Sequence, residues 1–189
     1  MKKGKLFVIS GPSGTGKGTI CDRIISETDD VELSVSMTTR EPREGEIEGK
    51  NYFFVSEDEF LKAIEEDGFL EHAKVYEHSY GTPKKAVLER LEKGTDVILE
   101  IDTQGAMNIK KKFPEGVFIF IMPPSIEELR RRIESRGKDS PETIELRLGE
   151  AEKEMRLADE YDYRVTNDDL DEAVERVKEI MDAEHMKDE

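Results

Sequence analysis

The chain has 189 residues, enough for one domain that buries roughly 70% of its unfolded surface. Its 29 basic and 45 acidic side chains give a formal net charge of −16, which argues against nucleic acid as a partner because phosphate neutralisation supplies most of such affinity. The single cysteine, Cys21, excludes a disulfide framework and a cysteine metal site, and no stretch approaches the ~20 apolar residues of a membrane span. We therefore expect a cytoplasmic protein without a cleaved leader, a membrane partner or a nucleic-acid partner, in which small phosphorylated ligands need only a local cluster of cations.

The first expected element is a strand over residues 6–9, an apolar run that leads into a glycine-rich turn. The turn reads Gly11-Pro12-Ser13-Gly14-Thr15-Gly16-Lys17-Gly18-Thr19, and an amphipathic helix over 20–26 follows it. Glycines allow successive backbone N–H groups to point into one concavity, where the helix dipole and the Lys17 ammonium add positive charge. A bare glycine-rich turn is often only a tight strand-to-helix connection, but the flanking strand and helix favour a site for the polyphosphate of a nucleotide.

Gly18 stands where this motif usually carries the Ser or Thr hydroxyl that contacts Mg²⁺. We therefore expect the metal to be held mainly by phosphate oxygens, water and a carboxylate elsewhere. Thr19 supplies a hydroxyl one position later, at the start of the helix, where it can contact a phosphate.

Four later apolar runs alternate with helical patterns. We expect strands over 33–35, 97–101, 117–122 and 163–165, and helices over 105–112, 125–135 and 170–181. Continuous apolar runs are typical of strands that are covered on both faces, and the alternation indicates an α/β fold with a five-stranded parallel sheet flanked by helices. Ligands of such sheets lie at the carboxyl ends of the strands, which is where the glycine-rich turn falls.

Two segments depart from this alternation. Residues 36–94 are mixed in pattern and rich in Arg, Glu and Tyr, and we interpret them as an inserted substrate-binding subdomain. Residues 136–147, with Gly137, Lys138 and Pro141 between two arginines, are interpreted as a lid. The remaining residues, 1–35, 95–135 and 148–189, form the core of what we expect to be a single domain over 1–189.

The insert begins with a loop that carries two arginines. Pro42 lies between Arg40 and Arg43 and disfavours a helix, so the loop is expected to be extended. Surface arginines are usually solvated, but two guanidinium groups beside the nucleotide turn can clamp a second phosphate bidentately.

These segments together resemble the guanylate kinase family. The resemblance rests on the glycine-rich turn, on the spacing Ser36, Arg40, Arg43 followed by Gly49-Lys50-Asn51-Tyr52, and on Glu100-Ile101-Asp102-Thr103-Gln104-Gly105. It covers residues 5–183, and it implies the P-loop nucleoside monophosphate kinase fold with strand order 2-3-1-4-5, a GMP-binding insert and a lid. It also implies transfer of the γ-phosphoryl of Mg-ATP to GMP, giving ADP and GDP, in purine metabolism and GMP recycling. The sequence leaves a monomer and a homodimer both open.

The resemblance also implies roles for particular residues. The ATP site would comprise residues 11–19 with Arg132, Arg136, Arg147 and Asn167, the last beside adenine. The GMP phosphate would contact Arg40, Arg43, Tyr52 and Tyr80, and guanine would contact Ser36, Glu71 and Thr82, with Asp102 close to the base and the one candidate side chain for Mg²⁺. The catalytic residues would be Lys17, Arg40, Arg136 and Arg147. Two positions depart from the family pattern: Glu100 stands where Asp is frequent, which leaves the geometry near the reaction centre open, and Thr82 stands where many members carry Ser.

The chemistry of guanine supports Glu71 independently. Guanine presents N1–H beside an exocyclic amine, and one carboxylate accepts from both, whereas adenine presents an unprotonated N1 that would face the carboxylate lone pair to lone pair. Hydrogen bonds to charged groups contribute roughly 1.5–3 kcal/mol, about tenfold or more per contact. Ser36 and Thr82 can donate to guanine O6. Without the family pattern, Glu71 would be read as one more exposed glutamate in an acidic chain.

The remaining polar and aromatic candidates have structural interpretations. His72, His78 and His185 lack metal-ligand spacing, and Phe53, Phe54 and Phe60 are expected in the core of the insert. The run Arg130-Arg131-Arg132 spreads over different helix faces, so at most two of its members can reach a ligand.

Two other functions remain as alternatives. A non-catalytic guanylate-kinase-like interaction module is disfavoured because such modules typically have eroded phosphate loops, whereas this chain keeps Lys17. A kinase of the same architecture for another phosphorylated molecule, such as a ribose bisphosphate, is disfavoured by Ser36, Glu71 and Thr82.

Overall fold

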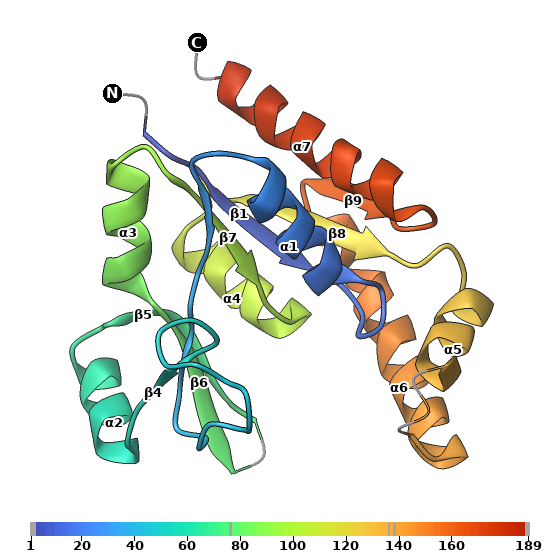
Figure 1. Cartoon of the computed structure of the whole chain (residues 1–189), viewed down its shortest axis with the longest axis horizontal. Helices are drawn as coiled ribbons and strands as arrows, with labels where there is room; N and C mark the ends of the chain where they lie inside the picture. Colours follow the sequence, from blue (N-terminus) through green and yellow to red (C-terminus); the bar gives the residue numbers. More distant parts are fainter. Residues whose placement is uncertain (1–2, 76, 136, 138, 188–189) are drawn as a thin grey trace.

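The computed structural model describes residues 3–75, 77–135, 137 and 139–187, and it is built around a five-stranded parallel sheet (Figure 1). The strands are β1 (Leu6–Ser10), β2 (Val31–Leu33), β7 (Asp96–Glu100), β8 (Val117–Met122) and β9 (Tyr163–Thr166). Their order, β2-β7-β1-β8-β9 with parallel pairing throughout, confirms the predicted fold class and strand order. The second strand lies two residues earlier than the expected 33–35, because the ladder with β7 pairs residues 31–33 and the chain then leaves for the insert.

Helices cover both faces of this sheet. They are α1 (Lys17–Glu27) and α7 (Leu170–Met186) on one face, and α3 (Lys84–Glu92), α4 (Thr103–Lys112) and a 3₁₀ turn (Arg156–Glu160) on the other. The central strand β1 shows the alternation that this requires: Phe7 and Ile9 pack with α1 and α7, whereas Leu6 and Val8 pack with the opposite layer. The apolar runs of the sequence therefore mark strands that are buried on both faces.

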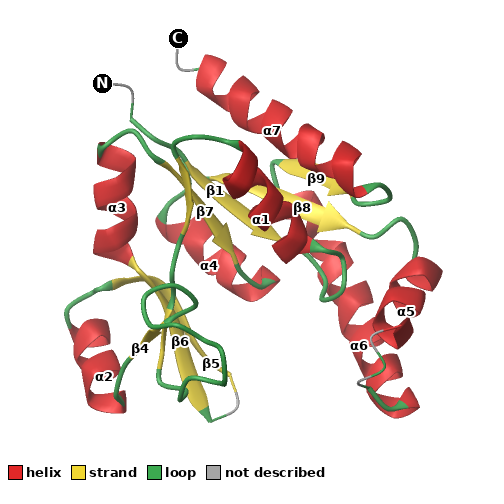
Figure 2. Cartoon of the chain, in the orientation of Figure 1, coloured by secondary structure: helices red, strands yellow, loops and turns green. Residues whose placement is uncertain are grey.

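The insert forms a smaller, mainly antiparallel sheet beside α3 (Figure 2). It contains β3 (Met37–Thr38), β4 (Phe53–Phe54), β5 (Phe69–Val75) and β6 (His78–Pro83) in the order β4-β3-β6-β5, with α2 (Glu57–Glu65). Phe60 is buried and stacks on Phe69 with ring centroids 4.6 Å apart, as expected for a core residue. Phe53 and Phe54 are only half-buried, so the expectation that they belong to the core of the insert is wrong: the ring of Phe54 packs on Tyr52 and under Arg40.

The predicted lid falls on a helical hairpin that follows the carboxyl end of β8 (Figure 1). Helix α5 (Ile126–Ser135) packs on α6 (Pro141–Met155) through Leu129, Ile133, Ile144 and Leu148. Ser140 accepts from the Thr143 N–H at 3.2 Å and so caps α6, with proline at the first helical position. The first half of α6 thus belongs to the predicted 136–147 segment, in which Arg136 and Lys138 lie outside the described residues.

The C-terminal helix is longer than expected and is tied down at its end. Tyr163 donates to Glu184, and the Nε2 atom of His185 lies 2.8 Å from Asp96 at the start of β7. The helix therefore continues past the expected end at residue 181, because two hydrogen bonds hold its last turn against the sheet.

Candidate active site

The turn between β1 and α1 curls tightly enough to favour glycine at three places. Gly11, Gly14 and Gly16 have φ values of 141°, 94° and 90°, in the region that favours glycine. A Cβ atom on Gly11 would lie 2.3 Å from the Ile121 carbonyl oxygen, so the loop packs directly on β8. Thr15 is buried and donates its hydroxyl to the Pro12 carbonyl at 2.9 Å, which braces the loop from within. The residues form a concave loop at the N-terminus of a helix, which is the geometry of an anion site.

The ammonium of Lys17 lies against this loop. It donates to the carbonyl oxygens of Gly11 at 2.7 Å and Pro12 at 2.9 Å. Burial lowers the pKa of Lys17, and the carboxylates of Glu100 and Glu154 oppose that shift. Phosphate oxygens are acceptors of the same kind as these carbonyls, so a polyphosphate in the loop lies within reach of the ammonium.

A cavity of about 450 Å³ lies over the loop. The loop forms one wall, and Glu100, Asp102 and Glu154 form another. Burial raises the pKa of Glu100 and of Glu154, and Lys17 opposes both shifts. A Cβ atom on Gly18 would lie 3.5 Å from Oε2 of Glu100, so the longer acid at this position faces the place where the motif usually carries a hydroxyl.

The donor set bears on the predicted magnesium ion. Within the described part of the chain, no three His, Cys, Asp or Glu side chains converge on one point. Asp102 commits Oδ1 to the Gly105 N–H at 2.7 Å, where it caps α4. These residues fit an ion held through phosphate oxygens and water, with Asp102 beside the loop, rather than an all-protein cage.

Predicted ATP-side residues on α5, on α6 and directly after β9 lie beside the same loop. A guanidinium N–H of Arg147 donates to the hydroxyl of Ser13 at 3.0 Å, and the group also pairs with Asp139. Asn167 is buried and donates Nδ2 to the Thr15 carbonyl at 2.7 Å. Arg132 donates to the Asn167 carbonyl at 3.0 Å and pairs with a glutamate of its own helix. Its neighbours Arg130 and Arg131 are also paired with glutamates. Arg136 lies outside the described residues.

A second cavity, of about 350 Å³, adjoins the first. It is lined by Ser36, Tyr52, Glu71 and Tyr80 from the insert and by residues 100–102 from the core. The tripeptide Glu100-Ile101-Asp102, at the carboxyl end of β7, lines both cavities. The residues predicted for two different nucleotides therefore face each other across one shared wall.

Glu71 is the buried acid of this second cavity. Its side chain is 8% exposed in the register position opposite Thr82, whose hydroxyl donates to Oε1 at 3.2 Å. Burial raises the pKa of Glu71, and the Thr82 hydrogen bond opposes that shift. A hydroxyl has one proton, so Thr82 in this arrangement orients the carboxylate instead of donating to a base, and Ser36 is left as the predicted donor to guanine O6.

The arginine loop carries a contact that the sequence analysis missed. Arg40 forms a two-pronged ion pair with Glu46, at 2.8 and 3.0 Å, and its guanidinium lies 5.4 Å from the centre of the Tyr52 ring. Glu46 also accepts from the backbone N–H of Arg43 at 2.7 Å. The Arg40 guanidinium lowers the pKa of Glu46 by this hydrogen bonding. The loop therefore presents Arg40 as a fork already matched to a planar anion, with Tyr80 packed edge-on to Tyr52 beside it.

Two acids of the site, Glu46 and Glu154, were missed by the sequence analysis. Glu46 had a local signal, because it lies three residues after Arg43 in a loop that must turn. Glu154 had none: it is one of many glutamates on an exposed helical pattern, and only tertiary packing brings it to the cavity that Lys17 also lines.

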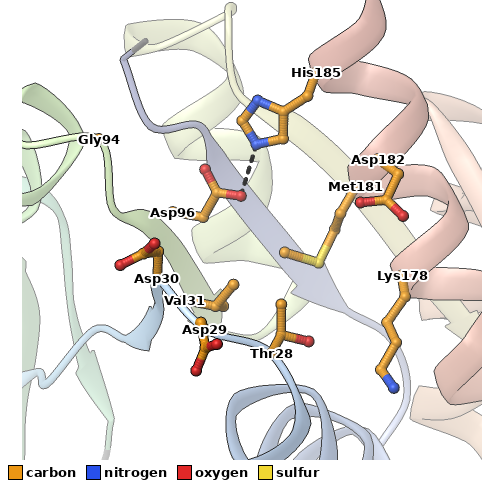
Figure 3. Close-up of a pocket in the computed structure, with 10 residues that line it drawn as sticks. All are labelled: Thr28, Asp29, Asp30, Val31, Gly94, Asp96, Lys178, Met181, Asp182 and His185. Atoms are coloured by element: carbon orange, nitrogen blue, oxygen red, sulfur yellow. Dashed lines mark hydrogen bonds and ion pairs between the residues drawn. The ribbon is translucent and has the colours of Figure 1, made fainter. Parts of the chain in front are cut away.

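A third cavity, of about 310 Å³, opens at the opposite edge of the sheet, where β2 and β7 begin (Figure 3). It is also charged, but its buried acid and its lysine are already paired. Asp96 is buried and accepts from the Lys5 N–H and from His185, both at 2.8 Å. Lys178 pairs with Glu27 at 2.6 Å. This arrangement fastens α7 to the sheet and is a structural feature.

No helix among the described residues is long and apolar enough to cross a membrane.

Comparisons with known proteins agree with this geometry. A family model described as guanylate kinase matches residues 3–184. The chain is 60% identical over 183 residues to a guanylate kinase of Caldanaerobacter subterraneus, covering 97% of this chain and 89% of that protein. It is 50% identical over 187 residues to a guanylate kinase of Clostridioides difficile, covering 99% of this chain and 91% of that protein.

Solved structures give the same result. A crystal structure of guanylate kinase from Anaplasma phagocytophilum superposes with a TM-score of 0.77 at 38% identity, covering 98% of this chain and 88% of that one. An uncharacterised protein from Eubacterium ventriosum shares the fold alone, with a TM-score of 0.53 at 14% identity.

Proposed function

The chain belongs to the guanylate kinase family, and we propose that its two adjoining cavities bind ATP and GMP and align them for transfer of the γ-phosphoryl group, giving ADP and GDP. The observation that carries the assignment of the two cavities is their shared wall, residues 100–102. Substrates bound on either side of this wall would bring the donor and acceptor phosphates together.

The donor site would be built from the phosphate loop and the helical hairpin. Backbone amides of residues 11–19 and the Lys17 ammonium would bind the β- and γ-phosphates. Arg132, Arg136 and Arg147 would lie over the phosphates, and Asn167, which already braces Thr15, would adjoin adenine. Two of these arginines contact the loop or its brace in this structure, which supports the assignment.

The acceptor site would be built from the insert. Arg40 and Arg43, with Tyr52 and Tyr80, would bind the GMP phosphate, which replaces the Glu46 carboxylate as the partner of the Arg40 fork. Glu71 would accept from guanine N1–H and the exocyclic amine, oriented by Thr82, while Ser36 would donate to O6 and Asp102 would lie close to the base. Because adenine has no proton on N1, the same carboxylate rejects AMP.

The chemistry requires alignment and charge neutralisation. An oxygen of the GMP phosphate attacks the γ-phosphorus, a new P–O bond forms, and the bond to the β-phosphate oxygen breaks to release ADP. The acceptor phosphate has a second pKa of about 6 and is already ionised at neutral pH, so no general base is needed. Lys17 and Arg40 would hold donor and acceptor in line, while Arg136 and Arg147 would neutralise charge on the transferring group. A bound Mg²⁺ would supply further charge neutralisation, and Asp102, which lines the cavity over the loop, is the side chain that would help to hold it.

The experiment that tests this assignment is ADP release, measured with GMP, AMP, UMP and ribose bisphosphates as acceptors. We expect turnover with GMP at least tenfold above the others. Stoichiometric nucleotide binding without turnover would instead indicate an interaction module, and preference for a sugar phosphate would indicate a different kinase.

Location and assembly are further parts of the proposal. Because the substrates are cytoplasmic nucleotides, we place the enzyme in the cytoplasm, and because one chain supplies both cavities, we expect a monomer or a homodimer with independent sites. Specific activity that does not change on dilution across the dimer dissociation range would support independent sites.

A further inference from the structure

Helix α6 contributes two charged side chains, Arg147 and Glu154, to the phosphate-loop site. Arg147, Ala151 and Glu154 are spaced i, i+4 and i+7, which places them on one side of a helix. Arg147 donates to the Ser13 hydroxyl at 3.0 Å, Ala151 is buried, and Glu154 lines the cavity over the loop. On this side of the helix, Arg147 supplies a cation to the site and Glu154 supplies an anion. The mechanism above uses only the cation.

The position of Glu154 is unfavourable for a carboxylate that has no role. It is half-buried, it faces the cavity that would hold a polyphosphate, and its nearest described hydrogen-bond partner is the Thr103 hydroxyl, at a long 3.4 Å. A buried acid costs free energy unless a cation compensates for it. The cation with the largest opposing effect on the raised pKa of Glu154 is Lys17.

Lys17, in turn, requires nearby negative charge to keep its ammonium protonated. Its ammonium lies in a loop where burial favours the neutral amine, and charged groups from several elements surround it. Glu100 approaches from β7, Asp102 from the start of α4 and Glu154 from α6, while the Cys21 thiol of its own helix stays neutral because burial raises its pKa. Of the three acids, Glu154 alone is carried by the hairpin that also brings Arg147.

We propose that Glu154 is a positioning residue for Lys17. Its carboxylate keeps the ammonium charged and attracts it from the carbonyls of Gly11 and Pro12 toward the phosphate cavity. Helix α6 would thereby position both Lys17 and Arg147. The placement of the α5–α6 hairpin would therefore be coupled to the position and charge of the lysine in the phosphate loop. The inference rests on the proposed ATP site. Its test measures nucleotide binding and does not depend on turnover.

The test is the pH dependence of ADP affinity, measured by calorimetry without metal between about pH 7.5 and 10.5. Above pH 7.5 the phosphates of ADP are ionised, since their second pKa is about 6, so loss of affinity reports loss of protein cations. At alkaline pH the affinity for ADP should fall as the Lys17 ammonium loses its proton, and we call this fall the alkaline limb. We expect the limb to lie about one pH unit lower in Glu154→Gln than in wild type, because removal of a nearby carboxylate lowers the pKa of the ammonium. Glu152→Gln makes the same chemical change at an exposed position of α6 and should leave the limb in place.

Two further variants identify the group that titrates. Glu154→Asp should restore part of the limb, whereas Lys17→Arg, whose guanidinium does not titrate, should remove the limb altogether. An alkaline limb at the same pH in Glu154→Gln as in wild type would overturn the inference. This holds even if the variant binds ADP more weakly because it is less stable, or more tightly because a repulsive charge has been removed. A limb that survives in Lys17→Arg would overturn it as well. Failure of the wild-type protein to bind ADP would instead contradict the proposed function.

Discussion

The phosphate cavity and the cavity beside His185 lie at opposite edges of one sheet and differ in how their charges are used. At the carboxyl edge, Lys17 donates to two loop carbonyls and to no other group among the described residues, while two acids whose pKa is raised line the same cavity. At the amino edge, Asp96 has both oxygens engaged and Lys178 is paired. The two cavities are similar in size, so size does not tell a binding site from a structural joint.

The two cavities differ in the free energy that a charged ligand would gain by binding there. Charges that satisfy one another are already compensated, and a ligand would have to break their bonds before gaining its own. Charges held against weak partners in a partly desolvated pocket gain when a polyphosphate arrives. The comparison predicts that substitutions at the first edge change catalysis with little effect on stability, and that those at the second edge do the reverse.

The largest effect should come from Lys17→Ala. Removal of the one ammonium of the phosphate loop should lower kcat by about 10²–10³-fold, the range for loss of one charge-stabilising group at a reaction centre. The melting temperature should stay close to wild type, because loss of the long side chain opens the two carbonyl acceptors to water from the cavity. Near-normal turnover in a coupled ADP assay would show that the loop does not hold the donor.

Glu71→Gln should have the next largest effect. An amide has one acceptor oxygen and would present its NH₂ to the guanine amine, so KM for GMP should rise by about tenfold or more and the preference for GMP over AMP should narrow. Thr82→Val serves as the companion variant, because it leaves the acid but removes the hydroxyl that orients it. A GMP to AMP ratio that stays unchanged in Glu71→Gln would remove Glu71 from base recognition.

The pH dependence of GMP binding should show the same residue. Burial raises the pKa of Glu71, and only the ionised form accepts from both guanine donors, so affinity should be lost as pH falls through that raised pKa. The GMP phosphate also titrates, near pH 6, and contributes its own limb in every variant. Isothermal titration of wild type and Glu71→Gln separates the two, since the variant should keep only the phosphate limb.

At the amino edge, Asp96→Ala should act on stability alone. The substitution removes the acceptor that the Lys5 N–H and the His185 ring share. Loss of the partner of a buried donor lowers the free energy of unfolding by about 1–3 kcal/mol. Such a loss lowers the melting temperature by about 2–4 °C per kcal/mol in a domain of this size. Asp29→Ala, an exposed position on the rim of the same cavity, is the matched control. A fall in kcat with unchanged melting temperature would reverse the assignment of this edge.

The contrast also explains what the sequence could and could not predict. The strands, their order and the phosphate loop follow from short, local signals: apolar runs buried on both faces, and glycines at positions such as Gly11 where a Cβ atom would strike β8. The carboxyl edge was predictable because its chemistry lies in contiguous motifs, and Glu71 was found through the family pattern. Whether these residues bind the nucleotides as assigned remains a prediction.

The contacts that were missed join distant parts of the chain. Asp96 and His185 are 89 positions apart, and neither lies in a motif. Glu154 and Lys17 line the same cavity only because of how α6 packs in the fold, and the helical pattern around Glu154 is that of a solvated acidic face. Long-range pairing of common residue types leaves no periodic or compositional trace, so packing alone shows it.

The most direct test of two anion sites across a shared wall is a crystal structure with ADP and GMP bound together. The account predicts the β-phosphate of ADP on Lys17 and the GMP phosphate on Arg40 and Arg43, with Arg40 released from Glu46 and the two phosphates facing each other beside residues 100–102. A structure in which Arg40 keeps its pair with Glu46 and GMP lies elsewhere would contradict it.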